Sequence, residues 1–435
     1  MPNSPYDLCC LAYLARRRGH YHSFFPNLRR LRFTVPGYLK QCPRVFLQHS
    51  SVSLSLGWNE GDGDVFKVLS CIENYAPELE GLDLGSYIMD RDGAACVENC
   101  RLLSAFVCKM KNLTRLACGS LALSDSALLH LASLPHLQFL QTPNDVDDIV
   151  RSIKAHRDGD LEQPFPSLQR LSVRGYGDLK SFARFFACIR PAHMRSLTLS
   201  FSNSSPALDV GEAFSALHES SSHQELRQLS FTHEGTVPVP QSSMQRFIID
   251  EWVLRTLFAF TNLTKFELTL KAAFALNDLH MKEMAAAWPR LRSLQLGSLS
   301  GWGQPSEITL HGILHLLAGC RELEYLGISI DVSPTSVPLL SMITPQHVNK
   351  HITYLHIGDS DFASDEPKDR DGFLYHSFVQ PRRILQTAAV LVKMFPELNG
   401  IGGAWLYSQS TPHQPKWELV IKEVRLIRSK GLNPA

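Results

Sequence analysis

The chain has 435 residues, with 43 basic residues against 42 acidic ones and a formal net charge of +1. This balance argues against a global attraction to nucleic acid or to an anionic membrane surface. Because 435 residues exceed the usual size of one compact core, the length predicts either several domains or one extended repeat array.

The N-terminal segment, residues 1–24, lacks the pattern of a secretory signal. Its short apolar run precedes Arg16, Arg17 and Arg18, whereas basic residues come first in a signal peptide. No window of the sequence is long and apolar enough for a membrane span. We therefore expect a protein of the cytoplasm or nucleus, with its ten cysteines reduced.

A leucine-spaced element recurs along the chain. It reads as proline or a polar residue followed by Leu-x-x-Leu-x-Leu, and its copies follow one another every ~31 residues, within the range of solenoid repeats. The copies lie at residues 25–33, 49–57, 76–84, 110–118, 134–142, 165–173, 192–200, 223–231, 260–268, 288–296, 320–328, 350–358 and 395–401.

The stretch "AAAWPRLRSLQLGS" indicates what one copy forms. Leu294 and Leu296 alternate with polar residues or glycine, which is typical of a strand with one buried face. The segment before it predicts a helix that Asn277 or Asp278 caps and that ends before Pro289, since proline disfavours helical geometry in the preceding residue. The apolar stripe of this helix is predicted to consist of Leu279, Met281, Met284, Ala285 and Trp288.

Residues 113–140 contain the clearest complete unit. A strand over residues 113–118 is followed by a helix that Ser124 or Asp125 caps and that runs through Leu131. Stacked units of this kind bury both apolar faces, so the predicted fold is an α/β, leucine-rich-repeat-like solenoid with parallel strands on its concave face and helices on its convex face. The alternative is an ordinary α/β domain rich in leucine.

Several segments depart from the repeat pattern. Residues 143–164 are polar and predict a short surface helix with a loop, while the Ser-, Thr- and Pro-rich residues 201–224 and 233–245 predict loops at the rim. Residues 358–383 form a charged insertion. Long insertions of this kind are tolerated in loops and sometimes carry binding.

No catalytic or cofactor motif is present in the sequence. The cysteines at positions 96, 100, 108 and 118 lack the paired spacing of a zinc site, and buried cysteine packs as a small apolar residue. His311 and His315 have the spacing of a zinc-protease helix, but Gly312 stands where that motif needs glutamate. We expect no metal, no cofactor and no enzyme activity; an enzyme would have to assemble its site from distant repeats.

Alternate strand residues point into the predicted concave groove and are the candidate protein-binding residues. The first half of the set is rich in arginine, whose guanidinium group binds carboxylates and phosphates in a bidentate manner, and the second half is aromatic. The competing interpretation is a solvated polar strand face. The set consists of Arg30, Arg32, Arg115, Arg170, Arg174, Lys265, Glu267, Tyr325, Tyr354 and His356.

Several longer stretches resemble the leucine-rich-repeat region of F-box proteins from mushroom-forming fungi. They are "LALSDSALLHLASLPHLQFL", "FALNDLHMKEMAAAWPRLRSLQLGS", "ITLHGILHLLAGCRELEYLGI", "ITYLHIGDSDF" and "AVLVKMFPELNGI", with "KWELVIKEVRLIR" similar to that family's closing Trp-anchored helix. The resemblance implies a substrate receptor of a cullin-type ubiquitin ligase, in which an F-box binds the adaptor subunit and the repeats bind a protein substrate.

The F-box itself has no counterpart in this sequence. Residues 1–24 resemble the helical segment that follows the box, residues 25–401 the solenoid, and residues 402–435 a C-terminal capping segment. Adaptor binding is therefore expected only if a box is supplied upstream. We expect a non-enzymatic module that binds a protein partner in the groove, without nucleic acid or membrane; the alternative is a stand-alone repeat scaffold unrelated to ubiquitin transfer.

Overall fold

The structure, a computed structural model, covers most of the repeat region and divides into two compact units. Their bounds are Met1–Gly177 with Arg184–Met194, and Asp178–Ala183 with Arg195–Ala435. The described residues are 29–35, 53–58, 69, 78–85, 94–155, 163–175, 179–202, 206–233, 247–270, 272–297, 302, 304–333, 336–360, 381–403 and 414–430. Residues 1–24, predicted to be helical, lie outside them.

The first unit alternates strands with helices. Its strands pair in parallel and in chain order from β1 to β6. The elements are β1 (Arg30–Val35), β2 (Ser53–Trp58), β3 (Gly81–Asp83), α4 (Ala94–Val107), β4 (Arg115–Ala117), α5 (Asp125–Ser133), β5 (Phe139–Thr142), α6 (Val146–Ala155) and β6 (Arg170–Arg174). The helix α7 (Leu179–Ile189) contains residues of both units.

The second unit continues the pattern. Its parallel strands follow the order β7, β8, β10, β12, β13, β14, β15, and β9 pairs with β11 in a separate small sheet. The elements are β7 (Ser196–Phe201), α8 (Ala207–Ser220), β8 (Gln228–His233), β9 (Ile248–Asp250), α9 (Glu251–Arg255), η3 (Thr256–Ala259), β10 (Lys265–Thr269), β11 (Ala273–Ala275), α10 (Asp278–Ala287), β12 (Ser293–Leu296), α11 (Leu310–Gly319), β13 (Tyr325–Ile328), η4 (Leu340–Met342), η5 (Pro345–His347), β14 (Tyr354–His356), α12 (Pro381–Met394), β15 (Gly400–Gly402) and α13 (Gln414–Ser429).

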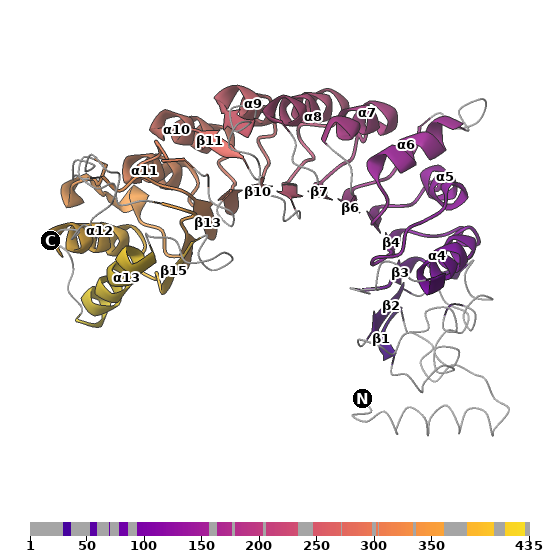
Figure 1. Cartoon of the computed structure of the whole chain (residues 1–435), viewed down its shortest axis with the longest axis horizontal. Coiled ribbons are helices and arrows are strands. Elements are labelled where there is room, and N and C mark those ends of the chain that lie inside the picture. The colour runs from indigo at the N-terminus through magenta and orange to yellow at the C-terminus, as the bar shows by residue number, and fades with distance from the viewer. Residues whose placement is uncertain are drawn as a thin grey trace, which may run out of the picture. The chain divides into compact units, whose positions relative to one another are not determined.

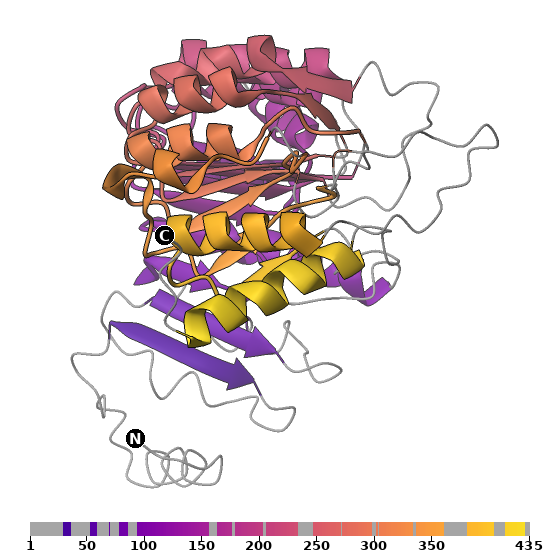
Figure 2. The same cartoon turned by 90° about the vertical axis from the view of Figure 1, so that its left-hand side faces the viewer.

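The predicted α/β solenoid is confirmed. Every copy of the leucine-spaced element overlaps one of these parallel strands. In each unit the helices lie on one side of the sheet (Figures 1 and 2). We call the opposite side of each sheet the helix-free face. Within the described residues, no helix is long and apolar enough to cross a membrane.

The core of each unit is built from register-matched rows of apolar side chains. Because neighbouring strands pair in parallel and in register, equivalent leucines of successive repeats stack on one another beneath the helices. One such row in the second unit consists of Leu197, Leu229, Phe266, Leu294, Leu326 and Leu355, all of them buried.

The helix α10 ends where the proline predicts. Asn277 caps it, with its side chain accepting hydrogen bonds from the Leu279 and His280 amides, and Trp288 terminates it before Pro289. Met281, Met284, Ala285 and Trp288 are buried as predicted. The prediction for Leu279 is wrong, since 59% of this side chain is exposed. Leu279 precedes Met281 by two residues, about 200° around the helix, so it faces solvent.

Two predicted irregular segments turn out to contain repeat helices. Within residues 143–164, Val146–Ala155 form α6, whose Val146, Ile149 and Ile153 are buried, so the helix contributes to the core. The loop predicted for residues 201–224 is wrong, because α8 fills most of it and buries Phe214 and Leu217. The serines at the end of this segment obscured the helical spacing of its apolar residues in the sequence. Residues 234–245 and 361–380, which make up most of the predicted rim loop 233–245 and the charged insertion 358–383, lie outside the described residues.

The C-terminal segment forms a helix anchored by tryptophan. Trp417 of α13 is buried, and its indole Nε1 donates a hydrogen bond to the Ser360 carbonyl over 2.9 Å. Arg428 donates to the Leu398 carbonyl over 2.7 Å. These bonds fix α13 against the last repeats, beside α12.

Candidate protein-binding face

The helix-free face of the first unit carries three of the predicted arginines in one register row. Side chains alternate between the two sides of a strand, so residues paired across the sheet project from the same side. The row reads Arg30, Ser53, Gly81, Arg115, Phe139 and Arg170.

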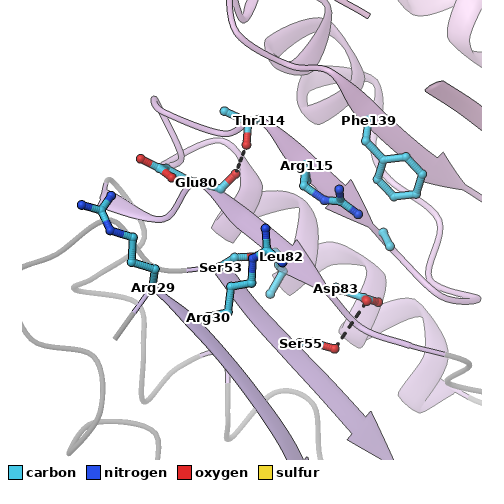
Figure 3. Close-up of a pocket in the computed structure, with 11 residues that line it drawn as sticks. Arg29, Arg30, Ser53, Ser55, Glu80, Leu82, Asp83, Thr114, Arg115 and Phe139 are labelled. Carbon is cyan, nitrogen blue, oxygen red and sulfur yellow. Dashed lines mark hydrogen bonds between the residues drawn. The ribbon is translucent and has the colours of Figure 1, made fainter. Parts of the chain in front are cut away.

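Small residues within this row open a hollow of about 360 Å³. Ser53 and Gly81 lie between Arg30 and Arg115, and a Cβ atom on Gly81 would overlap the Ser53 hydroxyl. A side chain at position 81 would therefore displace the Ser53 hydroxyl, and Arg30 and Arg115 enter the hollow from β1 and β4, the strands on either side of Ser53 and Gly81 (Figure 3).

The hollow is rich in guanidinium groups. Arg29, Arg30 and Arg115 line it and are exposed. The Arg115 guanidinium lies over the Phe139 ring, 5.0 Å from its centroid, a cation–π contact that holds the side chain in place (Figure 3). Within the part of the chain that the structure describes, no ion pair joins Arg30 or Arg115 to a carboxylate.

Two carboxylates also line the hollow. Asp83 accepts a hydrogen bond from the Gly85 amide over 2.8 Å and a longer one from the Ser55 hydroxyl over 3.4 Å. Glu80 has an exposed side chain, while its backbone carbonyl accepts a hydrogen bond from the Thr114 hydroxyl over 2.8 Å. The hollow is thus lined by three arginines and two acidic residues. One of the two acids, Asp83, already accepts hydrogen bonds from neighbouring residues.

The other predicted arginines lie beside the hollow rather than in it. Arg32, Arg170 and Arg174 are exposed on β1 and β6, but none of them lines it. Arg170 is next to Phe139 in the register row, so it extends the basic surface.

In the second unit, Lys265 and Glu267 neutralise each other. Their Nζ and Oε2 atoms are 2.9 Å apart, and the Ser230 hydroxyl also donates to Glu267 over 2.9 Å. An incoming ligand would have to compete with these contacts, so the pair is a weaker candidate than the arginines.

The predicted aromatic residues come together at β13 and β14. The ring centroid of His356 lies 5.1 Å from that of Tyr325 and 4.8 Å from that of Tyr354. The Tyr354 ring lies close over Gly400, where a Cβ atom would leave it no room. Burial lowers the pKa of His356, so its neutral form is favoured in this cluster.

Several residues of both units were not predicted from the sequence. Ser53, Gly81 and Phe139 occupy the same alternate positions as the predicted arginines, so the strand period could have identified them. Leu208 and Trp252, 65% and 73% exposed near the starts of α8 and α9, lie on helices, so the strand period gives no signal for them.

The comparisons with known proteins assign no family. No protein-family model matches the chain, and no curated protein matches it significantly. Among the described residues, no group of three or more His, Cys, Asp or Glu side chains is arranged to hold a metal ion.

Proposed function

We propose that this chain is a non-enzymatic protein-interaction module that binds a protein partner on its helix-free face. The observation that supports this most directly is the hollow between Arg30 and Arg115, which have no carboxylate partner in the described residues. Unpaired guanidinium groups on a fixed sheet are suited to bidentate hydrogen bonds with carboxylates. The partner segment is therefore acidic.

The sheet geometry suggests the spacing of the acidic residues. Arg30 and Arg115 are three strands apart, or about 14 Å between their Cα atoms at the usual spacing of paired strands. An extended peptide covers ~3.3 Å per residue. Two acidic side chains about four positions apart would thus reach both guanidinium groups.

The test uses the full chain and labelled acidic peptides with this spacing, measured by fluorescence anisotropy. The double variant Arg30→Glu/Arg115→Glu should bind at least about tenfold more weakly, because each charged hydrogen bond contributes ~1.5–3 kcal/mol. Lys111→Glu/Lys154→Glu changes the charge equally at exposed positions outside the hollow and should bind normally. Equal weakening in both variants would reduce the effect to net charge and contradict the proposal.

A second pair of arginines tests how far the surface extends. Arg170→Glu/Arg174→Glu alters exposed strand positions without removing core contacts, so the free energy of unfolding should stay unchanged while partner binding is lost. Unchanged binding would restrict the surface to the hollow.

We further propose that the module is the substrate-recognition half of an F-box-type receptor, acting in the cytoplasm or nucleus. The support is the sequence resemblance together with the repeat fold; ubiquitin transfer would belong to other subunits. Immunoprecipitation from native cells distinguishes this from a stand-alone repeat scaffold. Recovery of the ligase adaptor and cullin supports the receptor, whereas their absence favours the scaffold.

A further inference from the structure

A second hollow, of about 630 Å³, lies in the second unit away from the helix-free face. The turn after α11, the segment before β14 and the last turn of α12 border it. It has three basic side chains and three apolar ones among its walls: Arg321, Lys350, Lys393, Ile343, Pro345 and Val348.

The lining of this hollow has positive charge without a compensating carboxylate. No Asp or Glu is among its described lining residues. Glu322, the neighbour of Arg321 in sequence, instead pairs with Arg292, whose Nη2 lies 2.7 Å from its carboxylate. Glu397, near the end of α12, pairs with Arg428 over 3.3 Å. The acids closest in sequence to Arg321 and Lys393 therefore pair with other arginines.

Asn349 fixes the geometry of the hollow. Its side-chain amide donates to the Leu323 carbonyl over 2.8 Å and accepts from the His351 amide over 2.8 Å. Its backbone amide donates to the Met394 carbonyl over 2.8 Å. One buried residue thus joins all three segments, so the walls are positioned before any ligand binds, which lowers the entropic cost of binding.

Helix ends do not account for this charge. A basic residue in the last turn of a helix interacts favourably with the partial negative charge there, and this explains Lys393 of α12. Lys350 belongs to no helix, and Arg321 follows the end of α11. Three full positive charges also exceed the half-charge that each helix end supplies.

We propose that this hollow binds the phosphate group of an organic phosphate ester. A phosphate monoester has up to two negative charges and three acceptor oxygens, so it can satisfy more of these donors than a carboxylate can. Ile343, Pro345 and Val348 provide an apolar wall for the organic part, which inorganic phosphate would not use. The phosphate can belong to a small metabolite or to a phosphorylated protein side chain.

The experiment is calorimetric titration of the full chain with three probes: inorganic phosphate, phenyl phosphate and a short phosphoserine peptide. Phenyl phosphate should bind more tightly than inorganic phosphate. The double variant Lys350→Ala/Lys393→Ala should bind the preferred probe at least about tenfold more weakly. Lys282→Ala/Lys422→Ala removes two charges from exposed positions of the same unit, outside the hollow, and should bind normally.

The probes also identify the source of the phosphate. Tighter binding of phenyl phosphate supports a small metabolite, and tighter binding of the phosphopeptide, with no binding of its unphosphorylated form, supports a modified protein. Equal weakening in both double variants, or no binding of any probe at millimolar concentration, would overturn the proposal. Circular dichroism establishes that each variant is folded; if the double variant is not, the single substitution Lys350→Gln at an exposed position replaces it.

Discussion

Neighbouring residues on one helix or strand can have opposite environments. Met281 is buried in α10, while Leu279, two positions earlier, faces solvent.

Trp288, Trp302 and Trp417 are large and buried, yet each indole donates to a backbone carbonyl: those of Leu257, Leu296 and Ser360. Apolar character alone predicts burial of the ring, but only the folded structure determines where its N–H finds an acceptor.

His356 gives a prediction on pH at the residue scale. Burial lowers its pKa in the folded state below the ordinary value of 6.5, so the unfolded chain binds more protons in the window between the two values. The His356 contribution to stability is therefore complete above pH 6.5 and falls as the pH decreases through this window. We expect the free energy of unfolding, measured in urea, to fall when the pH is lowered from about 7.5 to about 5.5. The fall should be smaller for His356→Gln than for the unchanged protein. An identical loss in both would contradict this.

At the scale of elements, two helices approach each other closely through glycine. A Cβ atom on Gly312 of α11 would overlap the Asp278 side chain of α10 and lie 3.1 Å from the Asp278 Cα. Asp278 cannot easily yield, because it accepts hydrogen bonds from the Thr309 amide and hydroxyl over 2.7 Å and 2.6 Å. The glycine that departs from the zinc-protease motif thus has a packing role.

We expect Gly312→Ala to destabilise the protein. Alanine favours helix by ~1 kcal/mol over glycine, but overpacking at a helix contact typically costs about 1–3 kcal/mol. The free energy of unfolding should therefore fall despite the better propensity. His315→Ala, on the exposed side of the same helix, should leave it unchanged or raise it slightly. A stabilised Gly312→Ala protein would show that α10 can move aside.

At the scale of the whole molecule, each unit is a stack of repeats in which every repeat contacts its neighbours. Stability in such arrays is a sum of repeat terms and interfaces between adjacent repeats. A defect in one repeat should therefore spread to the adjoining repeats and weaken with distance along the stack.

Leu294→Ala tests this expectation. Leu294 is fully buried in β12 and pairs in register with Phe266 and Leu326, so its truncation should cost about 2–5 kcal/mol. Hydrogen exchange should accelerate most in β10, β12 and β13, and least in β3 and β4. Ser293→Ala, on the helix-free face of the same strand, should change neither quantity measurably. Uniform acceleration throughout the chain would contradict the nearest-neighbour expectation.

The sequence alone determined the strands of the main parallel sheet, their order and the side of each that is buried, whereas the small sheet of β9 and β11 was not predicted. The reason is physical: alternation of leucine with polar residues, and the proline or polar residue that precedes each copy, are local signals, and stacking repeats extends them without long-range pairing choices. The sequence also predicted that Arg30, Arg115, Tyr354 and His356 point away from the helices. Where serines interrupted the apolar period, as in α8, the same local signals failed.

Only the tertiary structure decided which of these side chains act together. Gly81 and Ser53 open the space between Arg30 and Arg115, whereas Lys265 is neutralised by Glu267, two residues away on the same strand. No repeating sequence pattern predicts the basic hollow whose walls Asn349 connects. Its walls come from three segments that are separated along the chain, and sequence patterns do not show which segments a buried amide will connect.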